Sequence, residues 1–249
     1  MVSKTEDCAV AFVDVLGFRA LVSRAHANDE DASALVAVME LLEGVVPALD
    51  AKVDRSVVTA PMIPQCAQFS DSIVLLAPLR VNGRPYYNGL EIVAMRCIQV
   101  AHIALDHGYL VRGGIDIGPI FRVGANIAGR AYMNAVATEK AAKNPRIVLC
   151  EDADRWWTSN DWGSDRMRVR FDGQSMINVL HPAYTPDESA SAGAVVPMAS
   201  LESQYKRYLD ITTAQARNKA LDCKARRKWK WMVKYVEFVA RTESFRLTS

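Results

Sequence analysis

The pattern of apolar and polar positions divides the first 150 residues into short strand-like runs and longer helical stretches. Residues 8–14 ("CAVAFVD") form a continuous apolar run that ends in Asp14, which predicts a buried strand. A helical pattern begins at Gly17, and a longer one covers residues 31–53. We expect Asp31 or Ser33 to cap the N-terminus of that second helix.

Turn residues and helical spacing predict the elements that follow. The run "FSDS" separates two apolar stretches, so we expect a hairpin that turns at Ser70, Asp71 and Ser72. A second hairpin is expected over 109–124, with its turn at Gly118–Pro119. The other expected elements are a helix over 90–108 ending at Gly108, a helix over 129–144 and a strand over 145–150.

This order, β-α-α-β-β-α-β-β-α-β, predicts an α+β fold with a mixed, mostly antiparallel sheet and helices outside it. A ferredoxin-like β-α-β-β-α-β core fits within the order. We expect residues 1–150 to form this core. Residues 151–249 should add a hairpin around Asp172–Gly173, a polar loop over 184–197 and C-terminal helices from Met198, all packed on the same domain.

Composition is that of an ordinary soluble protein. Half of the 249 residues are hydrophobic, 23% are charged and the formal net charge is +2, which predicts no bulk attraction to nucleic acid or membranes. The polar N-terminus does not resemble a signal peptide, and no apolar run approaches the roughly 20 residues of a membrane span. We therefore expect a cytoplasmic protein.

Cysteine and histidine spacing argues against a disulfide framework and against zinc. The five cysteines are scattered without a C-x-x-C pair, so we expect free thiols, with Cys8 and Cys66 buried in strands. His102 and His107 lie five residues apart, which does not align them on one helix face, so both are interpreted as core or surface residues.

Two aspartates occupy positions that suit metal binding. Asp14 ends the first strand and Asp71 lies at a hairpin turn, and a ferredoxin-like sheet would bring the two together. Close carboxylates repel unless a proton or cation lies between them, and Mg²⁺ commonly uses one or two carboxylates plus substrate phosphates. The alternative is that both aspartates are simple turn residues.

Two further features point to phosphate. "VLGF" should place backbone N–H groups at the start of a helix, where unpaired donors and the helix dipole favour anions. Arg112 precedes a Gly-Gly pair in a strand, and glycine there marks a bulge or a close approach by another backbone or a ligand. Arg112 is either a bidentate phosphate contact or a surface arginine. Asp116 is an alternative carboxylate that we interpret as structural.

In this order, "DVLGF", "FSDS" and "RGGIDIGP" resemble the catalytic domain of class III nucleotidyl cyclases. The resemblance covers roughly residues 8–150. It implies that two divalent cations, Mn²⁺ or Mg²⁺, are held by Asp14, Asp71 and the carbonyl of Val15. It also implies a 3′,5′-cyclising reaction of a nucleoside triphosphate that releases pyrophosphate, in a homodimer with active sites at the interface. The implied triphosphate contacts are the amides of Leu16, Gly17 and Phe18, with Arg112.

The sequence departs from the purine-specific members of that family. A base-reading lysine four residues before the second aspartate is replaced by Ala67. The usual Asn-x-x-x-Arg pair would fall on Met133 and Ala137, with Asn134 one residue away. Gln68 and Phe69 are therefore the candidates for the base pocket.

A narrower resemblance extends over most of the chain. "GRAYMNAVATEKAAKNPRIVL" and "KARRKWKWMVKYVEF" are similar to the pyrimidine cyclases of the bacterial Pycsar antiphage system. The similar positions are Glu139, Ala142, Pro145-Arg146-Ile147, Lys228 and Trp231. The resemblance implies conversion of UTP, or less readily CTP, to a cyclic nucleotide that a separate effector protein reads. Lys140, Lys143 and Arg146 become candidate triphosphate or transition-state contacts, unless they form a solvated basic face.

Two alternatives remain at this stage: a purine nucleotidyl cyclase, and a catalytically silent nucleotide-binding module that dimerises. The basic run "KARRKWKWMVK" contains Trp229 and Trp231, but its helical spacing and the near-neutral overall charge favour a packed terminal helix over a nucleic-acid or membrane surface.

Overall fold

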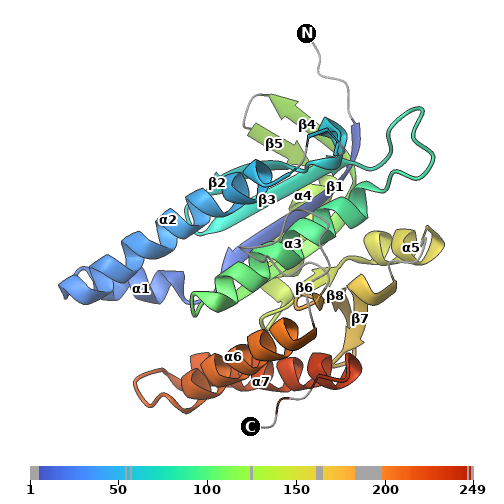
Figure 1. Ribbon diagram of the computed structural model, residues 1–249. Helices are drawn as coiled ribbons and strands as arrows, with labels where there is room; N and C mark the ends of the chain where they lie inside the picture. Colours follow the sequence, from blue (N-terminus) through green and yellow to red (C-terminus); the bar gives the residue numbers. More distant parts are fainter. Residues whose placement is uncertain are drawn as a thin grey trace.

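The computed structural model describes residues 6–53, 55–56, 58–123, 126–160, 165–182, 198–245 and 247. A single sheet runs through this part of the chain in the order β2-β3-β1-β4-β6-β8-β7, with β5 paired to β4 (Figure 1). The strands are β1 (Glu6–Val15), β2 (Gln65–Phe69), β3 (Ser72–Pro78), β4 (Val111–Val123), β5 (Asn126–Gly129), β6 (Ile147–Leu149), β7 (Arg168–Phe171) and β8 (Gln174–Ile177).

Helices connect the strands and end the chain. They are α1 (Phe18–Ala25), α2 (Asp29–Ala51), α3 (Gly89–Asp106), α4 (Arg130–Ala141), α5 (Glu151–Ser159), α6 (Met198–Arg217) and α7 (Cys223–Thr242), with short 3₁₀ turns at Ala60–Met62 and Asp165–Met167. The predicted order of elements up to residue 150 is therefore confirmed.

The ferredoxin-like core consists of β1, β2, β3 and β4 with the helices between them. Each adjacent pair in the order β2-β3-β1-β4 is antiparallel, as the prediction of a mostly antiparallel sheet requires. Beyond this core β6 runs parallel to β4, and β8 and β7 continue the sheet in antiparallel pairs. The α+β fold with a mixed sheet and C-terminal helices is confirmed.

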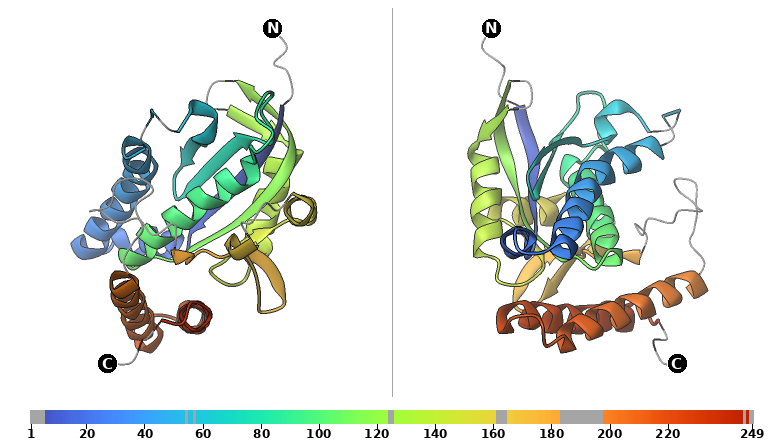
Figure 2. Two further views of the ribbon diagram at one scale, coloured as in Figure 1. Left: turned by 45° about the vertical axis from the view of Figure 1, so that its right-hand side comes forward. Right: turned by 90° about the vertical axis from the view of Figure 1, so that its left-hand side faces the viewer.

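Alternate residues of β1 face the two layers of helices. Ala9, Ala11 and Val13 belong to the large core formed with α2 and α3, whereas Val10 packs in a smaller cluster with Ala131 of α4. Figure 2 shows α4 on the side of the sheet opposite α2 and α3. Because successive strand residues point to opposite faces, Asp14 shares the α4 face with Val10.

The C-terminal helices pack against the sheet and α3. His102 of α3 is buried and lies 2.8 Å from the hydroxyl of Tyr208 on α6. Trp231 and Tyr235 of α7 pack against Phe171 of β7. The interpretation of the basic run as a packed terminal helix is confirmed (Figure 1). The division at residue 150 stays a prediction, and the loop expected over 184–197 lies outside the described residues.

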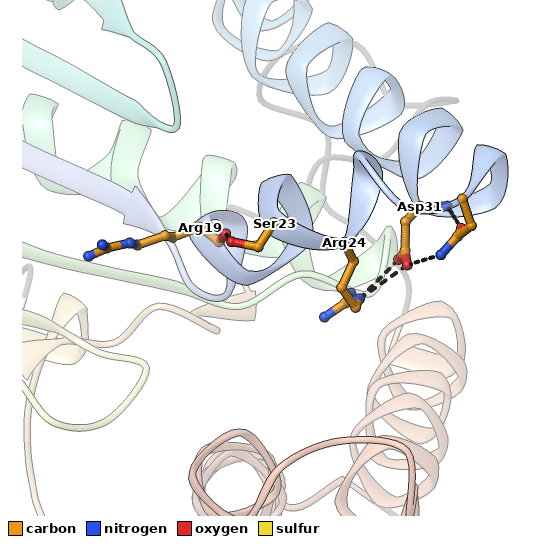
Figure 3. Close-up of polar contacts among 5 residues, drawn as sticks. Arg19, Ser23, Arg24 and Asp31 are labelled. Atoms are coloured by element: carbon orange, nitrogen blue, oxygen red, sulfur yellow. Dashed lines mark hydrogen bonds and ion pairs between the residues drawn. The ribbon is translucent and has the colours of Figure 1, made fainter.

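The prediction for the start of α2 was wrong. The cap is Asn28, whose Oδ1 accepts from the amide of Asp31 at 2.7 Å, and the helix begins two residues before Asp31. The Asp31 carboxylate instead lies 3.1 Å from Nε of Arg24 on α1 (Figure 3). Asparagine serves as an N-cap as readily as aspartate or serine, so the pattern alone did not distinguish them.

The turn predicted at Gly118–Pro119 was also wrong. β4 continues through both residues, which pair with Cys8 and Asp7 of β1, and its partner β5 begins only at Asn126. Within this strand Gly118 has a φ of 146°, which residues with a side chain rarely adopt.

Two expectations about burial need correction. α2 is long and apolar enough to cross a membrane by length and composition, with a mean hydropathy of 1.7, contrary to the expectation that no segment approached this. Core helices of soluble proteins can have the same length and hydropathy. All five cysteines are free as expected, but Cys66 is exposed because β2 is an edge strand, whereas Cys8 is buried.

Candidate functional site

Asp14 and Asp71 meet where β1 ends. Asp14 lies opposite Ser72 on β3 and opposite Arg112 on β4. The carbonyl of Asp71 accepts a hydrogen bond from the amide of Val15 at 3.1 Å, so the β2–β3 turn is attached to the tip of β1. The structure thus brings together the two carboxylates that the sequence suggested as a pair.

The Asp14 carboxyl is electrostatically strained. Burial raises the pKa of Asp14 to about 7, and the nearby carboxylates of Asp71 and Glu139 act in the same direction. A hydrogen bond from Ser72 Oγ to Asp14 Oδ1 at 3.2 Å and the charge of Arg112 oppose this rise in pKa only in part. A proton or a cation at Asp14 would relieve the repulsion.

The start of α1 lies directly after this carboxylate. Gly17 has a φ of 94°, a left-handed conformation that allows the chain to turn from β1 into the helix, and no side chain caps the helix. Unpaired N–H groups and the positive end of the dipole therefore lie beside Asp14. The Leu16 amide is not among them, because it donates to the carbonyl of Leu110 at 2.8 Å. This removes Leu16 from the expected phosphate donors and leaves Gly17 and Phe18.

The glycine pair of β4 allows α4 to approach the sheet closely. A Cβ on Gly114 would lie 2.4 Å from the carbonyl oxygen of Ala135, so only glycine fits beneath the helix. One turn further along α4, Glu139 is 3% exposed and forms an ion pair with Arg112. The close approach expected at the glycine pair is therefore made by another backbone, that of α4.

Arg112 is held by several groups of the chain. Nη1 donates to the carbonyl of Ala142 at 3.0 Å, and Nη2 contacts Glu139 and lies 3.8 Å from Asp14 Oδ2. These contacts engage Nη1 and Nη2, while the buried Nε has no hydrogen-bond partner among the described residues, and they do not favour the expected role as a free phosphate contact. The sequence named Glu139 only as part of a resemblance, and no local pattern marks it as the partner of Arg112.

The remaining residues of α4 lie away from Asp14. Asn134 donates to Asp116 Oδ2 at 2.8 Å, which supports the structural interpretation of Asp116. Met133 and Ala137 are exposed on the outer surface of the helix, and so is Lys140. α4 therefore brings Glu139, and none of these exposed side chains, to the carboxylates.

α7 brings a further cation to the cluster. Partial burial and the neighbouring Arg112 lower the pKa of Lys228, while Asp14 and Glu139 act in the opposite direction. Trp231, one turn along α7, donates from Nε1 to Asp172 at 3.1 Å. Arg146 is buried, with its guanidinium 3.6 Å from Asp172 and 6.0 Å from the ring centre of Trp231. Basic composition alone did not distinguish Lys228 from its neighbours in "KARRKWKW".

The two residues expected at the base pocket lie on different faces of β2. Phe69 pairs with Ser72 and Ala67 with Val74, which places both on the face of Asp14. Gln68 pairs with Ile73 and therefore points to the opposite face, towards α2 and α3. Gln68 was wrongly assigned to the pocket, because a one-residue step along a strand reverses the face.

The oxygen atoms around Asp14 suit a hard cation that also binds water or substrate phosphates. In the part of the chain that the structure describes, no group of three or more His, Cys, Asp or Glu side chains is arranged to hold a metal. Two carboxylates with adjacent backbone oxygens suit Mg²⁺ or Mn²⁺, which complete their shells with water and substrate phosphates. Burial and the neighbouring carboxylates of Asp71 and Glu139 raise the pKa of Asp14, so a cation beside it would be favoured.

No protein-family model and no curated protein matches the sequence. An adenylate/guanylate cyclase/hydrolase from Silicibacter pomeroyi is similar in structure, with a TM-score of 0.45 and 14% identity over 68% of this chain and 87% of that one. The adenylyl cyclase CyaB from P. aeruginosa is similar with a TM-score of 0.46 and 14% sequence identity, over 76% of this chain and 98% of that one. A class III adenylyl cyclase-like ATP-binding protein from Pseudomonas aeruginosa is similar with a TM-score of 0.45 and 14% sequence identity. The similar region covers 71% of this chain and 39% of that one. Likenesses this distant assign no activity to the chain.

Proposed function

We propose that this protein is a metal-dependent nucleotidyl cyclase that converts a pyrimidine nucleoside triphosphate to its 3′,5′-cyclic monophosphate and pyrophosphate. The observation that carries the proposal is the meeting of Asp14 and Asp71 at the end of β1, directly beside the uncapped N-terminus of α1. A pair of carboxylates next to free amides suits a metal-bound triphosphate.

Each group of the site has a proposed role. Asp14, Asp71 and the carbonyl of Val15 would hold two Mn²⁺ or Mg²⁺ ions, which lower the pKa of the ribose 3′-hydroxyl and polarise the α-phosphate. The amides of Gly17 and Phe18 bind the triphosphate at the positive end of the α1 dipole. Lys228 adds a positive charge beside the carboxylates and opposes the charge that develops on the phosphate oxygens.

Ala67 and Phe69 support a pyrimidine substrate. Both lie on the face of Asp14, and neither offers the lysine that reads the base in the purine cyclases that the sequence resembles. The Phe69 side chain is 47% exposed, so its ring is available to stack on a base. We propose UTP as the preferred substrate and CTP as the second, with ATP and GTP disfavoured.

The wider context follows from the same resemblance to antiphage pyrimidine cyclases. We propose a cytoplasmic enzyme that acts as a homodimer with its active sites at the interface. The cyclic nucleotide would signal phage infection to a separate effector protein. Neither nucleic acid nor a membrane is required as a partner.

Substitution of the two aspartates tests the metal roles. Asp14→Asn and Asp71→Asn should each lower the rate of cyclic UMP formation with Mn²⁺ by about 1,000-fold, because metal ions contribute several kcal/mol to catalysis of this type. Asp210→Asn on the exposed side of α6 is the matched control and should retain activity. Product formation is followed by chromatography. Unchanged rates in both site variants, with an active wild type, would remove the aspartates from the mechanism.

A further inference from the structure

Arg112 lies between two carboxylates and is closer to one of them. Its Nη2 contacts Glu139 directly and also forms a longer ion pair, at 3.8 Å, with its cross-strand neighbour Asp14. Directly opposed charges on neighbouring strands normally pair. Here the guanidinium is shared and lies closer to Glu139 on α4, and the carbonyl of Ala142 accepts from Nη1 at 3.0 Å.

We propose that Glu139 is a positioning residue that draws Arg112 towards α4, weakens its pairing with Asp14 and so keeps the Asp14 carboxylate available for a divalent cation. This inference rests on the proposed function, because it concerns the same metal site. The expected role of Arg112 as a phosphate contact is thereby replaced by that of a cation whose position is set by Glu139.

The fold places Glu139 for this role. Gly114 lets the α4 backbone lie against β4, and this contact carries Glu139 to the level of Arg112. The side chain of Glu139 is almost fully buried, so its charge needs a partner within the protein. A mobile surface carboxylate could not hold a guanidinium in one position in this way.

Charge balance explains why the diversion matters. Three carboxylates, Asp14, Asp71 and Glu139, lie near two cations, Arg112 and Lys228. If Glu139 were neutral, Arg112 would lose its closer partner and would pair fully with Asp14. The guanidinium would then neutralise the carboxylate that must bind the metal, and protein and metal would compete for the same charge.

Direct measurement of Mn²⁺ binding tests the proposal. Free Mn²⁺ is followed by electron paramagnetic resonance, without nucleotide, in wild type, Glu139→Gln, Arg112→Met and the double variant. Glu139→Gln should bind Mn²⁺ about tenfold more weakly or worse, since a cation near a carboxylate shifts its affinity for a proton by this order. Removing Arg112 as well should restore binding to within about threefold of wild type, as expected for two coupled residues.

A merely structural role predicts a different pattern. If Glu139 only supports packing, the double variant binds no better than Glu139→Gln, and the proposal is overturned. Glu139→Asp, which keeps the charge, should bind more tightly than Glu139→Gln. The matched control Glu43→Gln, on the exposed side of α2, should bind as wild type does. If Glu139→Gln does not fold, Arg112→Met decides alone: binding as tight as wild type or tighter supports the proposal, and weaker binding contradicts it.

Asp14→Asn separates this inference from the proposed function. Loss of Mn²⁺ binding in Asp14→Asn together with wild-type binding in Glu139→Gln would overturn the role of Glu139 and leave the metal site in place. Unchanged binding in Asp14→Asn would overturn the metal site and this inference together.

Discussion

Asp14 is a residue whose position lowers the stability of the folded chain. Its carboxylate is partly buried beside Asp71 and Glu139, and the resulting rise in pKa to about 7 makes the ionised form costly at neutral pH. Strained groups of this kind are tolerated where function requires them. A bound divalent cation would reverse the effect.

The destabilising effect of ionised Asp14 predicts that a neutral side chain at this position stabilises the protein more as the pH rises. The pKa of Asp14 in the folded chain lies above its usual value of 3.8, so ionisation of Asp14 removes stability as the pH rises from about 4 to 7. In the absence of metal, the free energy of unfolding of Asp14→Asn should rise by about 2 kcal/mol relative to that of wild type between pH 5 and pH 8. Urea denaturation in the presence of EDTA measures this difference. A constant difference between the two proteins would contradict the raised pKa.

Single residues differ in how far their roles can be read from sequence. Asp14 was identifiable because an acid ends an apolar run and a glycine turn follows it. Glu139 was not, because its partner Arg112 is 27 positions away and the two meet only once α4 packs on β4. Gln68 was misplaced because adjacent strand residues face opposite sides of the sheet.

The packing of α4 on β4 depends on the absence of a side chain at one position. Gly114 admits the backbone of the helix, and the polar residues of α4 then align with those of β4, with Asn134 at Asp116 and Glu139 at Arg112. The geometry of the site is thus set by a contact between two elements.

Gly114→Ala should disrupt this contact. The new methyl would lie 2.4 Å from a backbone oxygen that cannot move independently of α4, so we expect a loss of about 1–3 kcal/mol in the free energy of unfolding. Gly44→Ala is the control: it lies inside α2 with open space around it, and alanine there should stabilise by about 0.5–1 kcal/mol. Equal effects of the two substitutions in urea denaturation would refute the close approach.

Elements with strong periodicity were predictable, and their connections were less so. β1, α3 and α4 follow from apolar spacing, whereas the turn assigned to Gly118–Pro119 lies inside β4. Glycine and proline signal turns on average, but pairing with β1 overrides that tendency here. α5 carries a short apolar stripe within an acidic segment and was not predicted.

The C-terminal part of the chain completes the fold and reaches the site. β7 and β8 extend the sheet, α6 covers His102 of α3, and α7 carries Lys228 to the carboxylates. Both parts of the chain therefore contribute charged groups to the candidate site. The packing between these two parts could not be predicted from the spacing of apolar residues. The contacts join positions about 100 residues apart, such as His102 and Tyr208.

The contact between α3 and α6 predicts acid sensitivity. Burial lowers the pKa of His102 from 6.5 to about 4, so the neutral ring contributes stability above about pH 6.5 that is lost as the pH falls towards 4. Between pH 7 and pH 5 the free energy of unfolding of wild type, measured by urea denaturation, should fall by about 2 kcal/mol more than that of His102→Gln. Parallel pH profiles for the two proteins would show that His102 is not buried in its neutral form.

The identity of the product tests the proposed activity most directly. Purified protein is incubated with Mn²⁺ and an equimolar mixture of UTP, CTP, ATP and GTP, and cyclic nucleotides are identified by mass spectrometry, with Asp14→Asn as the blank. We predict cyclic UMP as the main product, cyclic CMP as a lesser one, and neither in the blank. Cyclic AMP or cyclic GMP as the main product would contradict the pyrimidine assignment, and the absence of any cyclic nucleotide would contradict the cyclase itself.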